Sequence, residues 1–98
     1  MYFRIQFAPG ANSNVVNGTV IMGERHTYIL GACGGQTMIL NISSLEANAV
    51  FDLYSPSGML MLQETTDWSG VLPEDGDYQV IVGGTRGNAT YTMQVQIY

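Results

Sequence analysis

Apolar and polar residues alternate along most of this chain, with a period of two that is typical of β-strands. The clearest case is residues 89–98, in which Tyr91, Met93, Val95 and Ile97 would share one face and threonine and glutamine the other. Shorter alternating segments, separated by Gly, Pro and Asn, are residues 2–7, 15–21, 26–33, 37–42, 49–54 and 59–63. The pattern predicts an all-β domain of eight or nine strands, a sandwich or barrel of antiparallel strands with one solvent-facing side.

Residues 67–82 are the stretch around which the rest of the strands are expected to be arranged. Two apolar runs are separated by residues 73–77, where Pro73 presets φ and Gly76 accepts a positive φ. This predicts a β-hairpin at the centre of the domain. The pair Gly34-Gly35 predicts a second hairpin between the third and fourth strands. Residues 89–98 could form either a central strand or a long edge strand.

The composition describes one folded domain, residues 1–98, with few charges. Its hydrophobic fraction of 46% argues against disorder. Charged residues make up only 11%, against about 25% in ordinary soluble proteins. There is no lysine, and the positive residues are Arg4, Arg25 and Arg86. So little charge suggests that some face is covered by a partner or by another copy of the chain.

The net charge of −5 bears on the class of partner. Three scattered arginines do not form the basic patch that nucleic acid or an anionic membrane surface requires. No apolar run approaches the roughly 20 residues of a membrane-spanning helix, and no signal peptide is recognisable within this chain. We therefore expect neither a nucleic-acid nor a membrane partner.

Catalytic chemistry is not indicated. His26 and Cys33 are the only histidine and cysteine and would lie on opposite faces of one strand, with His26 exposed at its start. Glu74, Asp75 and Asp77 lack the spacing of a calcium loop and are expected to be solvated turn residues. We expect no metal, no cofactor and no enzyme activity. Cys33 is either a small packing residue or a free thiol that could cross-link two chains.

Binding residues are suggested by residue type alone. Aromatic and arginine side chains anchor many interfaces, which favours Trp68, Tyr54, Tyr78 and Arg86 as a binding face. Trp68 could instead plug the core or its rim. The apolar run of residues 59–62 is either buried between two layers or half of an adhesive surface.

Several segments, in order, resemble a known group of bacterial β-domains. They are residues 18–28, residues 32–38 leading to 51–58, residues 68–78, and the closing Tyr91-Thr92-Met93. This order resembles the pre-peptidase C-terminal domain and, over nearly the whole chain, the related inhibitors of g-type lysozyme. The Phe7-Ala8-Pro9-Gly10 start is similar to the opening strand of the inhibitors.

The resemblance implies a jelly-roll-like β-sandwich that is extracytoplasmic (periplasmic, cell-surface or secreted) and lacks catalytic residues. In the inhibitors, arginines in the loop before the last strand enter the lysozyme cleft; here that loop is residues 83–87 and contains Arg86. The first hypothesis is therefore a non-catalytic module that binds a protein or glycan. The alternatives are an inhibitor of g-type lysozyme and a self-assembling subunit of a surface fibre or oligomer.

Overall fold

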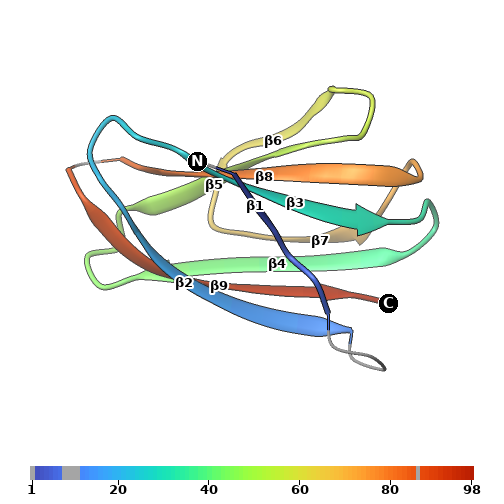
Figure 1. The fold of residues 1–98 in the computed structure, drawn as a ribbon, viewed down its shortest axis with the longest axis horizontal. Helices are drawn as coiled ribbons and strands as arrows, with labels where there is room; N and C mark the ends of the chain where they lie inside the picture. The colour runs from blue at the N-terminus through green and yellow to red at the C-terminus, as the bar shows by residue number, and fades with distance from the viewer. Residues whose placement is uncertain (1, 8–11, 86) are drawn as a thin grey trace.

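The computed structural model describes residues 2–7, 12–85 and 87–98, and nine strands lie within these ranges. They are β1 (Tyr2–Arg4), β2 (Ser13–Val20), β3 (His26–Ala32), β4 (Thr37–Ser44), β5 (Ala49–Tyr54), β6 (Leu60–Thr65), β7 (Asp67–Val71), β8 (Gly76–Gly84) and β9 (Ala89–Ile97). They form a five-stranded sheet in the order β1-β3-β8-β5-β6 and a four-stranded sheet in the order β2-β9-β4-β7. Figure 1 shows the two sheets as stacked layers, which confirms the predicted all-β sandwich.

Alternation along the strands decides which side chains fill the space between the sheets. The inward residues of β4, β8 and β9 are almost completely buried. They are Met38, Leu40, Ile42, Tyr78, Val80, Val82, Tyr91, Met93, Val95 and Ile97. Each of these strands is central in its sheet, so its inward face is covered by the opposite sheet. The strand at the C-terminus is therefore a central strand, one of the two placements that its pattern allowed.

The predicted central hairpin in residues 67–82 is wrong. β7 pairs with β4, whereas β8 pairs with β3 and β5 in the other sheet. Residues 72–75 reverse the chain and also carry it from one sheet to the other. Turn residues encode the change of direction, but whether two strands then pair or face each other depends on which arrangement buries both apolar faces.

The Gly34-Gly35 turn was also predicted to close a hairpin, and it too crosses between sheets, because β3 and β4 lie in different layers. The two crossings support each other. Gly35 N donates to Leu72 O at 2.8 Å, and Leu72 N donates to Gln36 O at 2.8 Å. Tyr78 Oη donates to Glu74 O and accepts from Glu74 N, which holds the second crossing in shape.

Two further features differ from a uniform antiparallel sandwich. β1 pairs with β3 in parallel, at the edge of the larger sheet. β6 forms the other edge of that sheet, with Met59 and Leu60 exposed and Met61 and Leu62 half-buried against the core. The apolar run of residues 59–62 is thus divided between core and surface. Among the described residues there is no helix with the length and apolarity needed to cross a bilayer.

Candidate binding surface

Three connections gather at one end of the sandwich, at the left of Figure 1: residues 21–25 between β2 and β3, residues 45–48 between β4 and β5, and residues 85–88 between β8 and β9. We call these three connections the loop end. They come from both sheets, so this end presents a composite surface that no single segment of sequence would form.

The buried side chain of Asn48 holds the loop end together. Its Nδ2 donates to Asn88 O at 3.0 Å, and its backbone carbonyl accepts from Thr85 N at 2.8 Å and from Thr85 Oγ1 at 3.3 Å. Asn88 Oδ1 in turn accepts from Met22 N at 2.7 Å. Thr85 and Asn88, at the two ends of the 85–88 connection, are therefore each bonded to another connection of the loop end.

Exposed apolar side chains occur on two of these loops. Ile21 is 54% exposed, Met22 is 71% exposed and Leu45 is 89% exposed. These apolar groups remain in water on connections that are hydrogen-bonded to one another, and loops held by a rigid scaffold are where binding residues often lie.

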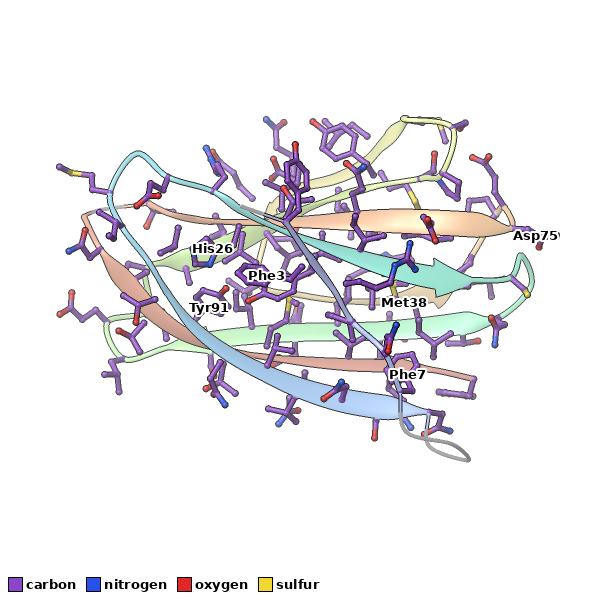
Figure 2. All side chains as sticks on the ribbon, viewed as in Figure 1. Phe3, Phe7, His26, Met38, Asp75 and Tyr91 are labelled. Atoms are coloured by element: carbon purple, nitrogen blue, oxygen red, sulfur yellow. The ribbon has the colours of Figure 1, made fainter. Side chains whose placement is uncertain are left out.

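A hydrogen-bonded cluster of aromatic residues lies between the sheets behind the loop end. His26 Nδ1 is 2.8 Å from Tyr91 Oη, and Tyr28 Oη is 2.5 Å from the same oxygen. Phe3 stacks on Tyr28 with ring centroids 5.2 Å apart. Figure 2 shows His26, Tyr91 and Phe3 together between the two layers. Burial, and secondarily the hydrogen bond with Tyr28, raises the pKa of Tyr91 far above its ordinary value, so this hydroxyl stays protonated.

The expectation that His26 is exposed was wrong. Its side chain faces inward together with Tyr28 and Leu30, because residues two apart on β3 share a face. Its Nδ1 is engaged by Tyr91, and the only cysteine, Cys33, lies outside on the β3–β4 connection. The arrangement is a structural polar contact rather than a nucleophile with its base.

A groove of about 530 Å³ runs beside this cluster, between the open edges of β1 and β2. Phe3 and Val16 contribute apolar walls, and Asn14 bridges the two edges by donating from Nδ2 to Gln6 O at 2.9 Å. The polar groups of Tyr28 at its base are committed to Tyr91, so the groove offers shape and apolar surface but no activated group.

The residues proposed from sequence as a binding face are not brought together. Tyr54 is half-buried on β5 and Trp68 is half-buried on β7, in different sheets. The Trp68 ring lies over Gly70, where a Cβ atom would come within 2.9 Å of Trp68 Cε2, and it packs against the core. Tyr78 is fully buried, so its side chain presents no surface to a partner. Arg86 lies outside the described residues.

Cys33 and the turn acids lie at the end opposite the loop end. Cys33 is exposed, which excludes the packing role and leaves its thiol accessible. Asp75 Oδ1 accepts from Gly34 N at 2.6 Å, and Glu74 Oε2 accepts from Ser57 Oγ at 2.7 Å. These acids therefore join neighbouring turns; Figure 2 shows Asp75 at that end. Over the described ranges, no group of three or more His, Cys, Asp or Glu residues could hold a metal ion.

Sequence reasoning missed Asn48 and the pairing of His26 with Tyr91. Asn48 looked like one more polar residue in a connection, and nothing nearby in the sequence marks it as an anchor. The inward position of Tyr91 was predicted correctly, but its partner lies on the other sheet. A polar residue at the inward position of an otherwise apolar strand, such as His26, is the one signal that could have indicated a buried polar contact.

Comparison with solved structures gives full-length matches. The g-type lysozyme inhibitor PliG of Aeromonas hydrophila matches with a TM-score of 0.87 and 27% identity, over 99% of this chain and 96% of that one. A mutant of the Escherichia coli inhibitor matches with a TM-score of 0.80 and 21% identity, over 99% and 97% of the two chains. The pre-peptidase C-terminal domain of Bacillus anthracis collagenase matches with a TM-score of 0.75 and 17% identity, over 98% and 95%.

No protein-family model matches the chain, and neither does any curated protein sequence. The structural matches support a non-catalytic binding module. The chain has the β-sandwich fold that periplasmic inhibitors of g-type lysozyme share with a pre-peptidase C-terminal domain.

Proposed function

We propose that this chain is an extracytoplasmic, non-catalytic protein that binds a g-type lysozyme through the loop end and inhibits it. The observation that carries the proposal is the match, with a TM-score of 0.87 over 99% of the chain, to a protein described as a periplasmic inhibitor of that enzyme. The pre-peptidase domain matches less well, with a TM-score of 0.75. An extracytoplasmic location is favoured for the same reason, since the inhibitors are described as periplasmic.

The surface at the loop end suits an enzyme cleft. Met22 and Leu45 offer exposed apolar contacts, and the 85–88 connection, which includes Arg86 in the sequence, is fixed at both ends by Asn48 and Asn88. Pre-ordered loops lose less conformational entropy on binding than free ones. Glycoside hydrolases act through a pair of cleft carboxylates, and an inserted arginine would bind such a carboxylate.

The proposal is tested by measuring peptidoglycan lysis by purified g-type lysozyme while this protein is added to excess. We expect lysis to stop at near-stoichiometric concentrations, and a c-type lysozyme to be unaffected. Met22→Asp and Leu45→Asp should each weaken inhibition about tenfold or more, equivalent to about 1.4 kcal/mol. Val71→Asp is the matched control, because Val71 is also apolar and 67% exposed but lies away from the loop end. Undiminished lysis in excess protein would refute the proposal.

Self-association is the second candidate function, and the exposed edge strand β6 favours it. Met59 and Leu60 are exposed beside the unpaired backbone of this edge. The chain contains no lysine, the residue that most often opposes pairing between edge strands of two molecules. A second copy could add its own edge strand there. A glycan partner has no comparable support, because Trp68 lies against the core rather than on an open face.

A further inference from the structure

The side chain of Arg25 lies over Gly83 of β8, where the absence of a side chain leaves room for it. Val82 faces the core, so a side chain at Gly83 would point outward from the larger sheet. A Cβ atom at Gly83 would lie 2.9 Å from Arg25 Cζ and 3.0 Å from Arg25 Cδ, and it would overlap Nη1. Gly83 is buried although it faces outward, because the Arg25 side chain covers it. The arginine is held against the sheet surface in the space that any larger residue at position 83 would fill.

The guanidinium of Arg25 has no polar partner among the described residues. Arg4 on the same sheet is different, since its Nη2 lies 2.8 Å from Asp77 Oδ2 in the one ion pair that the described part of the chain contains. Arg25 itself is exposed, and its guanidinium donates no hydrogen bond to any described residue. Its five N–H donors are therefore available to a ligand.

The charges around Arg25 favour an anionic group at this end of the molecule. Among the described residues, the loop end carries Glu24, Arg25 and Glu46, a net charge of −1, whereas Arg4 and the six remaining Asp and Glu residues together carry −5. The negative charge on the rest of the chain would repel a carboxylate of the partner, and this repulsion is weakest at the loop end. Arg25 also lies beside the anchored 85–88 connection, because Met22 of the same turn is bonded to Asn88.

We propose that Arg25 is a specificity-determining residue of the loop end, and that its guanidinium, aligned by Gly83, binds a carboxylate inside the cleft of the partner. This rests on the proposed function. A planar guanidinium recognises a carboxylate through two parallel hydrogen bonds, which fixes the orientation as well as the charge of the contact. Gly83 then has a positioning role: it contacts no ligand and determines where Arg25 lies.

Two variants test this in different ways, each in the intact chain with purified g-type lysozyme and binding measured by titration calorimetry. Arg25→Gln removes the charge, and Arg4→Gln is its control with the same change of net charge. Gly83→Ala keeps the charge and displaces the guanidinium. Gly31→Ala is its control, because Gly31 also faces outward from the larger sheet and a Cβ there would lie 3.4 Å from its nearest neighbour, Asp77 Oδ1. Thermal unfolding of each variant shows whether the fold is retained.

We expect Arg25→Gln and Gly83→Ala each to weaken binding at least tenfold, and the two controls to change it less than twofold. The double variant should be no weaker than Arg25→Gln alone, because displacing a guanidinium matters only while it is present. If wild-type protein binds the lysozyme and both variants bind equally well, the role of Arg25 is refuted and the proposed function stands. If the wild-type protein does not bind the lysozyme at all, the proposed function and the role of Arg25 are both refuted.

Discussion

The imidazole of His26 on β3 and the phenol of Tyr91 on β9 are hydrogen-bonded across the two sheets, with Nδ1 and Oη 2.8 Å apart. The contact joins residues that are 65 positions apart in the chain, and Tyr28 Oη completes it. The rest of the sandwich core is apolar. A shift of one sheet relative to the other would separate these polar groups and leave them buried without partners, so the contact favours one relative position of the two sheets.

Tyr91→Phe should lower the free energy of unfolding by about 1–3 kcal/mol, because His26 and Tyr28 lose the hydroxyl to which both are bonded. Urea unfolding monitored by Trp68 fluorescence measures the change. Tyr54→Phe is the control, since Tyr54 is only half-buried, and its effect should stay within about 0.5 kcal/mol. Equal losses in the two variants would show that the buried hydroxyl contributes nothing particular.

The raised pKa of Tyr91 makes stability fall in alkali. Below the ordinary tyrosine pKa of 10.0 both states hold the proton, and the contribution is complete. Above it the unfolded chain releases the proton while the folded chain retains it, so stability declines with a slope approaching about 1.4 kcal/mol per pH unit. Unfolding of wild type and Tyr91→Phe from pH 9 to 11 should converge. Parallel curves would contradict this assignment.

Gly18→Ala should destabilise the protein by about 1–3 kcal/mol. Gly18 on β2 is paired with Tyr91, and a Cβ at Gly18 would lie 2.8 Å from Tyr91 Oη and 3.0 Å from Tyr91 Cζ. The buried ring can yield only by breaking its contact with His26. Gly31→Ala, where a Cβ would make only ordinary contacts with Asp77 Oδ1 at 3.4 Å and Arg4 Nη1 at 3.8 Å, should change stability by less than about 0.5 kcal/mol in the same denaturation series.

Asn48→Ala should reduce both stability and inhibition. It removes the amide that donates to Asn88 O in a buried site, at a cost of about 1–3 kcal/mol, and it releases one end of the 85–88 connection. Unfolding and lysozyme titration should be measured together, with the exposed Asn41→Ala as control. A less stable variant with unchanged inhibition would show that anchoring of this loop is not needed for binding.

The proposed inhibitor should have a constant solution mass near 10.7 kDa over a hundredfold range of concentration in the presence of reductant. Without reductant, a dimer formed through the exposed Cys33 is expected, and Cys33→Ser should abolish it. Static light scattering measures both. A mass that rises with concentration despite reductant, and that Leu60→Asp returns to the monomer, would favour assembly through β6 instead.

Most of the strands were predictable because alternation is local. On β4, β8 and β9 the residues that share a face lie two positions apart, so the apolar face of each strand can be identified without knowing its neighbours. The same alternation predicted the class of fold, and composition determined the low content of charged residues. The candidate binding residues were chosen by type alone, which is why Trp68 and Tyr78 proved to lie against or within the core.

Only the tertiary structure decided which sheet each strand joins and which polar groups meet. Residues 72–75 and the Gly34-Gly35 turn carry the chain between layers, a choice set by burial of two apolar faces rather than by turn chemistry. The contact of His26 with Tyr91 and the position of Arg25 over Gly83 each join distant segments. Such contacts arise from the register of two sheets and from the absence of a side chain at one glycine, and no local pattern in the sequence encodes either.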